Sequence, residues 1–222
     1  MIYIAIPTIT PRLENCARWA IARTTPEPHR VIVARGRSHG ENLDAAFAGL
    51  PEDAEWFFTM DDDAAPLRVG WLSWLLKKTT EPGRVNLVTF GHSRAVGALY
   101  RVAALRRVPG VSFVQPVGGN PGEQIDVGFV RKILRVYNAP LWLRNCEAYR
   151  DGHGNLIFAH LGGGTIGHTW YHRGRLYPRI PTWLWPVMVK RYLRKIVGPQ
   201  AQLVHGRPHD ARMVRDHAEE AR

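Results

Sequence analysis

A chain of 222 residues with 45% hydrophobic and 22% charged residues has the length and composition of one globular domain, not of a disordered or fibrous protein. Its 30 Lys and Arg against 19 Asp and Glu give a formal net charge of +11, which predicts attraction to nucleic acid, anionic membrane or acidic glycan. Two distant cysteines exclude a disulfide framework. Neither a transmembrane segment nor a signal peptide is expected, so the predicted location is cytoplasmic.

The first third of the chain alternates short apolar segments with amphipathic ones. Strands are predicted over 2–6 and 29–34, with a third strand ending at Asp61, and helices over 12–23, 41–50 and 69–78. This alternation predicts an α/β fold, in which a mostly parallel central sheet is covered by helices on both faces. Right-handed crossovers would place Pro7-Thr8, the 35–40 loop and Asp61 to Asp63 at one sheet edge, where ligands bind in such folds.

The regular alternation of strands and helices ends in the middle of the chain. Strands are predicted over 85–90 and 96–100, a short helix over 102–107, and a Pro- and Gly-rich loop over 109–121. A helix is predicted over 123–136. Segments 141–144 and 156–159 are predicted to add antiparallel strands around a turn at 151–154.

The last part of the chain is basic and aromatic. A helix starting at Leu184 would place one apolar group of side chains on a single face, namely Trp185, Met188, Val189, Tyr192 and Ile196. We expect this face to pack on the core; membrane-surface contact through 183–197 and nucleic-acid contact are the alternatives. The expected organisation is a domain over 1–170 and a C-terminal extension over 171–222 that packs on it, frayed after about residue 205.

Three adjacent carboxylates, Asp61, Asp62 and Asp63, follow the third strand. They repel one another unless a cation or hydrogen-bond donors offset their charge. Hard divalent ions prefer carboxylate oxygens and keep phosphate oxygens as further ligands, so the triad predicts a metal–diphosphate site. The alternative is that Asp62 or Asp63 caps the helix after Pro66.

Five motifs in order resemble the family-2-type glycosyltransferases of the GT-A fold, over roughly residues 2–168. They are Pro7-Thr8, the segment Ser38 to Asn42, the Asp triad, Gly122 to Asp126, and His160 to Thr165. The resemblance implies a Rossmann-like GT-A domain that binds a nucleotide-diphosphate sugar, a UDP-sugar being the expected donor. The implied nucleotide-sugar residues are Pro7, Thr8, Arg12, Arg35, Asn42, Asp61 and Asp62. The implied ligands of Mn²⁺ or Mg²⁺ are Asp63, Asp61 and His160, with His168 as the alternative to the histidine.

The sequence departs from the family at two places. Gln124 stands where the family has an acidic base, which leaves Glu123 and Asp126 as candidate bases on one helix face. The alternative is that both only favour the helix start. The segment Ala34 to Ser38 lies where the family often has acidic residues that read uracil, so Arg35 or Arg37 is a candidate contact for phosphate or base instead.

These features predict a metal-dependent glycosyltransferase that inverts the sugar's anomeric carbon. The net charge of +11 makes DNA with a hydroxymethylated base the first expected acceptor, to be flipped out or single-stranded. A lipid-linked or cell-surface glycan is the alternative acceptor. A nucleotidylyltransferase is disfavoured because Thr8 to Pro11 lacks a Gly-rich basic signature, and a non-catalytic nucleic-acid-binding protein would leave the Asp triad without a role.

Overall fold

The structure is a computed structural model that describes residues 1–8, 10–81, 87–90, 97–107, 110–114, 141–143, 146–161, 171–172, 175–176 and 182–197. Its centre is a five-stranded sheet in the order β2-β1-β3-β6-β5. The bounds are β1 (Ile2–Pro7), β2 (His29–Ala34), β3 (Trp56–Met60), β5 (Leu87–Phe90) and β6 (Gly97–Arg101). β1 pairs in parallel with β2 and β3, and β6 is antiparallel to both β3 and β5. Four strands therefore run in one direction, which confirms the predicted mostly parallel sheet.

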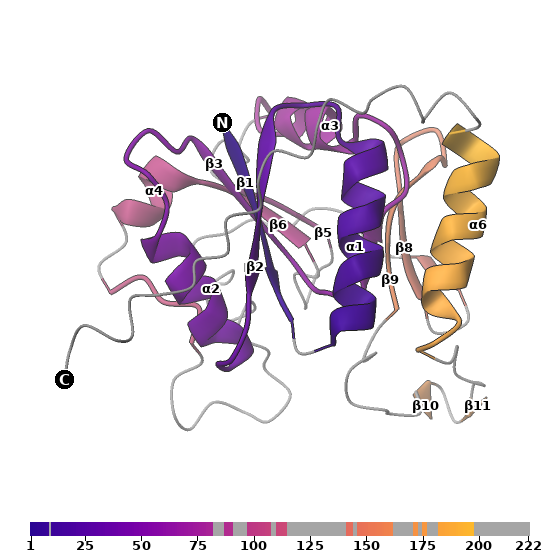
Figure 1. Cartoon of the computed structure of the whole chain (residues 1–222). Helices are drawn as coiled ribbons and strands as arrows, with labels where there is room; N and C mark the ends of the chain where they lie inside the picture. The colour runs from indigo at the N-terminus through magenta and orange to yellow at the C-terminus, as the bar shows by residue number, and fades with distance from the viewer. Residues whose placement is uncertain are drawn as a thin grey trace.

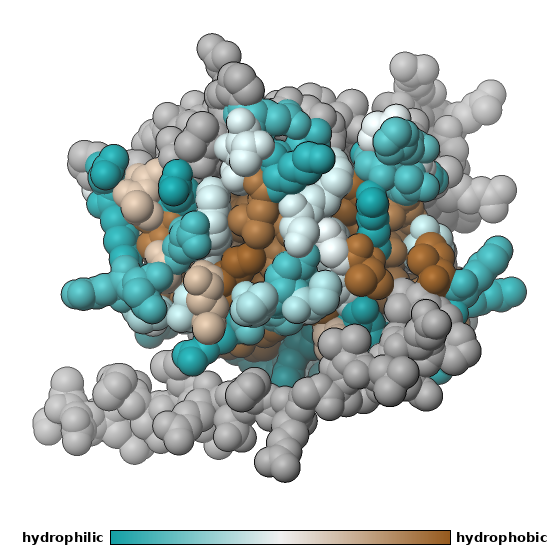
Figure 2. All heavy atoms as spheres, turned by 90° about the horizontal axis from the view of Figure 1, so that it is seen from above, coloured by the Kyte–Doolittle hydropathy of each residue, from teal (hydrophilic) through white to brown (hydrophobic). Residues whose placement is uncertain are grey.

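Helices cover both faces of this sheet, as the sequence predicts (Figure 1). Alternate side chains of β1 face opposite sides. One side, with Ile4, packs against α1 (Pro11–Thr24) and α3 (Trp71–Lys78). The other side, with Ala5, packs against α2 (His39–Ala48) and α4 (Val102–Arg106). Viewed from above, hydrophobic residues lie toward the middle and hydrophilic residues along the rim (Figure 2).

Local sequence explains where these helices begin. Pro11 occupies the first position of α1, where a missing N–H costs no hydrogen bond. Ser38 and Glu41 form a reciprocal capping box at the start of α2. Gly70, with φ of 73°, precedes α3, and the Glu27 carboxylate accepts a hydrogen bond of 2.8 Å from the Ser73 N–H. The alternative that Asp62 or Asp63 caps this helix is therefore wrong.

A second sheet, in the order β4-β9-β8-β7, lies beside the first. Its strands are β4 (Ala64–Pro66), β7 (Leu141–Leu143), β8 (Cys146–Arg150) and β9 (Leu156–His160), all paired antiparallel. The predicted antiparallel strands at 141–144 and 156–159 are confirmed as β7 and β9, but β8, which precedes the 151–154 turn and pairs with both of them, was not predicted. The sequence did not predict β4, whose three residues are too few to show a period. It also did not predict the small pair β10 (Tyr171–His172) and β11 (Arg175–Leu176).

The C-terminal helix α6 (Trp185–Val197) lies alongside α1 (Figure 1). Its buried stripe is Trp185, Val189 and Leu193, which packs among residues of α1 and the second sheet. Met188 and Ile196 were predicted to share the packed face, but they are 40% and 51% exposed. By helical period Met188 lies off the buried stripe, whereas Ile196 lies in line with it but on the last turn of α6, beyond Leu193, so that part of the prediction is wrong. The division at residue 170 stays a prediction, and the residues after 205 lie outside the described part.

Within the described part of the chain, no helix combines the length and hydrophobicity that a membrane crossing requires.

Candidate metal and nucleotide-sugar site

The edge where β1, β2 and β3 end holds the site. The Thr8 N–H donates to the carbonyl of Ala34 at 3.0 Å, which joins the ends of β1 and β2. The Thr8 hydroxyl donates to Asp62 Oδ2 at 2.7 Å in a buried hydrogen bond, which joins β1 to the Asp triad. The structure thus brings Pro7-Thr8, the start of the 35–40 loop and the triad to one edge.

Asp61, Asp63 and His160 form a group whose ligand atoms lie within 4.8 Å of one another. His160 Nε2 lies 3.0 Å from Asp63 Oδ1 and 3.3 Å from Asp61 Oδ2. The pairing of β4 with β9 produces this arrangement, because Ala64 is opposite His160 and the Leu161 N–H donates to the Asp63 carbonyl at 2.9 Å. Two segments about 100 residues apart therefore supply one group of donors.

The triad divides into one exposed and two buried carboxylates. Asp62 and Asp63 are 5% and 4% exposed, whereas the Asp61 side chain is 25% exposed. Burial raises the pKa of Asp62 to about 6; the charges of Asp63 and Asp61 also raise it, and the Thr8 hydrogen bond opposes the shift. The site thus concentrates negative charge and leaves one side, at Asp61, open to solvent.

His39 is a second histidine at this edge that the sequence did not single out. It is the first residue of α2, and its Nε2 lies 3.8 Å from Asp61 Oδ1. Asp61 therefore lies between two imidazoles, one buried and one partly exposed. The capping box of Ser38 and Glu41 could have indicated the position of His39 from sequence. It fixes the start of α2 and so places His39 at the sheet edge.

Arg35 is held by a residue that the sequence also missed. The buried carboxylate of Glu14, on the first turn of α1, accepts hydrogen bonds from Nε of Arg35 at 3.1 Å and from its Nη2. Arg18 is a further cation 3.5 Å from the same carboxylate. The Arg35 side chain remains 52% exposed, so its guanidinium is fixed at the edge of the sheet and still faces solvent.

The other predicted nucleotide-sugar residues have different surroundings. Pro7 ends β1 and is buried. Asn42 is 2% exposed and donates to the carbonyl of Arg37 at 3.0 Å, which ties the 35–40 loop to α2. Arg12 is exposed and donates to the carbonyl of Trp183 at 3.2 Å, so its observed contact is with the segment before α6.

The donor set fits a divalent metal ion. Donor separations of 3.0 and 3.3 Å match those of neighbouring ligands on one ion, about 3 Å for bonds of about 2.1 Å. Two carboxylates and one imidazole suit Mn²⁺, and Mg²⁺ fits the carboxylates, although it favours oxygen ligands throughout. Among the three described donors Asp61 is the most exposed, so a further ligand would enter from its side.

Glu123, Asp126, Gly122 and His168 lie outside the described residues, as do residues 162–170 as a whole. Their predicted roles therefore stay predictions.

No protein-family profile matches this chain, and no curated protein does either. Its fold is similar to that of several solved structures. One is the mannosyltransferase PcManGT from Pyrobaculum calidifontis in complex with GDP-Man and Mn²⁺, with a TM-score of 0.49 and 14% identity. The similarity covers 63% of this chain and 54% of the mannosyltransferase chain, so this chain spans about half of it.

Two further similarities extend over more of this chain. A197 from STIV has a TM-score of 0.42 and 12% identity, covering 78% of this chain and 99% of A197. The catalytic domain of Drosophila β1,4-galactosyltransferase 7 in complex with xylobiose has a TM-score of 0.43 and 14% identity, covering 85% of this chain and 79% of that chain.

Proposed function

We propose that this chain is a metal-dependent glycosyltransferase that moves a sugar from a nucleotide-diphosphate sugar to an acceptor hydroxyl. One observation carries the proposal: Asp61, Asp63 and His160 meet at the edge where β1 and β3 end, next to the Thr8–Asp62 hydrogen bond. Ligands of α/β sheets bind at this edge. Asp63 and His160 are buried and Asp61 is partly exposed, so a metal ion held by this group would be accessible to a ligand from solvent.

Each side chain has a defined part in the proposed site. Asp63 and His160 form its buried base, and Asp61 forms its open side. Thr8 holds Asp62 in place, which keeps the backbone of the triad fixed while its neighbours bind. A bound Mn²⁺ or Mg²⁺ would supply charge neutralisation for the departing diphosphate. The guanidinium of Arg35, held by Glu14, is the candidate contact for phosphate or base.

The proposed reaction is a single displacement with inversion. The acceptor oxygen forms a bond to the anomeric carbon, the bond from that carbon to the diphosphate oxygen breaks, and the acceptor proton goes to a carboxylate. Glu123 or Asp126 is the proposed proton acceptor. The sequence pattern Glu-Gln-Ile-Asp at a predicted helix start supports that assignment.

The proposal also names the class of sugar donor and the class of sugar acceptor. A UDP-sugar is the expected donor, and the cationic Arg35 makes a GDP-sugar the necessary comparison, because an arginine reads base acceptors such as guanine O6 and N7. The net charge of +11 supports an acceptor on a polyanion or an anionic surface. DNA with a hydroxymethylated base and a lipid-linked or cell-surface glycan are the two acceptors to be compared.

Thermal stabilisation by nucleotide sugars, with and without Mn²⁺, tests the proposal most directly. We expect one nucleotide sugar to raise Tm only when Mn²⁺ is present, and we expect slow metal-dependent release of its sugar. Asp63→Ala should abolish both effects. Asp53→Ala is the matched control, because Asp53 is an exposed aspartate on the turn before β3. Equal responses from both variants, or none from the wild type, would reject the transferase and leave a basic binding protein.

A further inference from the structure

Helix α6 has a second face whose side chains are exposed to solvent. Trp185, Val189 and Leu193 are buried against the domain, and the opposite side of the helix is open. Val187 and Met188 on that side are 50% and 40% exposed. Single exposed apolar residues are ordinary on protein surfaces. Here they are adjacent in sequence and lie one turn from Trp183, which is 57% exposed.

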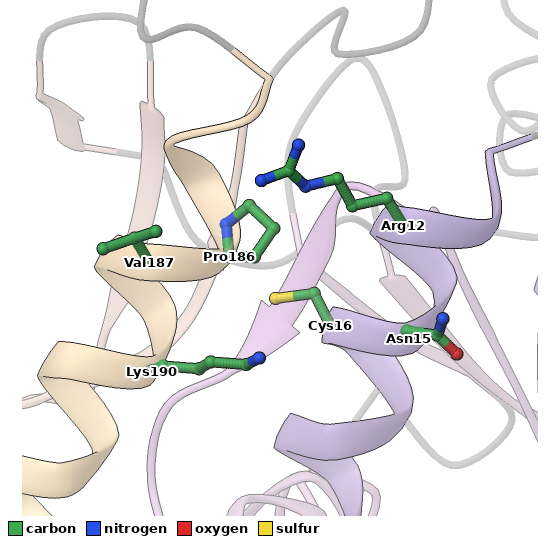
Figure 3. Close-up of a pocket in the computed structure, with 6 residues that line it drawn as sticks. All are labelled: Arg12, Asn15, Cys16, Pro186, Val187 and Lys190. Carbon is green, nitrogen blue, oxygen red and sulfur yellow. The ribbon is translucent and has the colours of Figure 1, made fainter.

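Cations surround these apolar side chains. α6 contains Lys190, Arg191, Arg194 and Lys195 and has no acidic residue. The one acidic residue of α1, Glu14, is 1% exposed, so it adds little negative charge to the surface. A groove of about 420 Å³ lies at the surface between the two helices (Figure 3). Its lining includes the side chains of Arg12 and Lys190 on either side and Cys16 between them.

The apolar end of α6 lies at the same edge of the molecule as the metal group. Arg12, at the start of α1, contacts Trp183 just before α6, and Trp19, a later residue of α1, has Lys190 5.9 Å from its ring centroid. The two helices therefore run in the same direction, as Figure 1 shows. Because α1 starts directly after β1 ends, Trp183, Val187 and Met188 lie near the edge that carries Asp61 and Asp63.

We propose that the face formed by Trp183 and the outer side of α6, together with the exposed cations of α1, docks on an anionic lipid surface. Trp183, Val187 and Met188 would enter the boundary between headgroups and acyl chains, and the arginines and lysines would contact lipid phosphates. The duplex backbone of DNA provides negative charge but no apolar layer for Val187 and Met188, so the exposed side chains favour lipid. This docking goes beyond the proposed transferase activity and does not depend on it. If the docking and the transferase activity are both correct, the sheet edge that carries Asp61, Asp63 and His160 (the metal edge) faces a membrane-bound acceptor.

Vesicle co-sedimentation of the full chain tests the docking. We expect binding to vesicles of equimolar phosphatidylglycerol and phosphatidylcholine, little binding to phosphatidylcholine alone, and loss of binding as salt increases. The double variant Arg191→Glu/Arg194→Glu should weaken binding at least about tenfold, because each cation near the surface contributes about 1 kcal/mol. The double variant Val187→Ser/Met188→Ser should weaken binding about threefold or more while leaving the salt dependence in place.

The control is Arg107→Glu, which reverses the charge of an exposed arginine at the end of α4, on the other side of the molecule from α6 (Figure 1). It should bind vesicles like the wild type. Metal-dependent nucleotide-sugar hydrolysis in solution should be equal in all these variants, which separates a docking failure from a failure of the transferase. Absence of anionic-vesicle binding overturns the proposal, and so does equal binding by all variants. A gel shift on duplex DNA at low salt without vesicle binding would assign the face to nucleic acid instead.

Discussion

The metal edge and the outer face of α6 both carry concentrated charge, but they hold it in opposite ways. At the metal edge two aspartates are buried, and the donors contact one another or Thr8 within about 3 Å. On α6 the four cations lie within residues 190–195, and all of them except the half-buried Lys190 are exposed. Burying charge costs free energy unless it is paired, so buried carboxylates in a fixed group indicate a small, strongly bound partner. Exposed cations with apolar neighbours suit an extended partner that is bound weakly at many points.

Removing one donor from the metal edge should have the largest effect. For Asp63→Ala we expect Mn²⁺ affinity to fall by more than the roughly 10- to 100-fold typical of losing a group that only supports a ligand. Calorimetric titration with Mn²⁺ measures this. His160→Ala should weaken binding in the same way, and His153→Ala, which changes an exposed histidine on the nearby turn, should not. Equal affinity in the His160 and His153 variants would contradict the site.

Truncating the inner face of α6 should have the next largest effect, on stability. Leu193 is 1% exposed, so Leu193→Ala removes packed atoms and leaves a cavity, at a cost of about 2–5 kcal/mol in the free energy of unfolding. Ile196→Ala, at a position 51% exposed, should cost less than about 0.5 kcal/mol. Urea denaturation of both variants measures the difference. Similar losses would show that α6 does not pack as described.

Breaking the hydrogen bond behind the triad should cost somewhat less. Thr8→Val keeps the side-chain shape and removes the hydroxyl that Asp62 accepts from, so we expect a loss of about 1.5–3 kcal/mol, the range for hydrogen bonds to charged groups. Thr8→Ser retains the donor and should lose much less. Thermal unfolding at neutral pH measures both. A Thr8→Val protein as stable as the Thr8→Ser protein would mean that this hydrogen bond does not stabilise the edge.

The smallest effect on stability should come from Asp151, on the turn between β8 and β9, and should appear only at acidic pH. Hydrogen bonds from Asn155 and His153, together with Arg68, lower the pKa of Asp151 to about 2. A lowered pKa stabilises the fold above the ordinary value near 3.8, and this contribution is lost as the pH falls toward about 2. The Tm of wild type should therefore decrease between about pH 4 and pH 2 more than that of Asp151→Asn. Parallel Tm curves would exclude this contribution.

The sequence predicted the parts of the molecule whose patterns are local. The apolar run before Asp61 and the spacing in α1 follow from the periods of strands and helices, and the fold rules then bring Thr8 and the triad together. Sequence did not predict β4, because the three residues Ala64–Pro66 end in a proline and have no readable period. His160 was implied by a family resemblance; the reason it reaches Asp63 is the β4–β9 pairing.

Contacts between distant segments were beyond the reach of pattern analysis. Nothing in the α1 sequence shows that Glu14 would be buried and bonded to Arg35, since that pair forms only when α1 packs beside β2. The periodicity of α6 placed Met188 and Ile196 with Trp185, but it could not show how wide the packed surface is around the helix, which leaves Met188 exposed, or how far it extends along the helix, which leaves Ile196 exposed. His39 gained its relevance from the position of Asp61, which lies on another strand end.

The short pairing of β4 with β9 also has a consequence for the order of events during synthesis. Asp61 and Asp63 leave the ribosome about 100 residues before His160. With synthesis at about 5–20 residues per second, His160 is added at least several seconds after the two aspartates. The complete three-donor set therefore cannot exist on a nascent chain that stops short of β9, and tight metal capture would mark a chain whose second sheet has already formed.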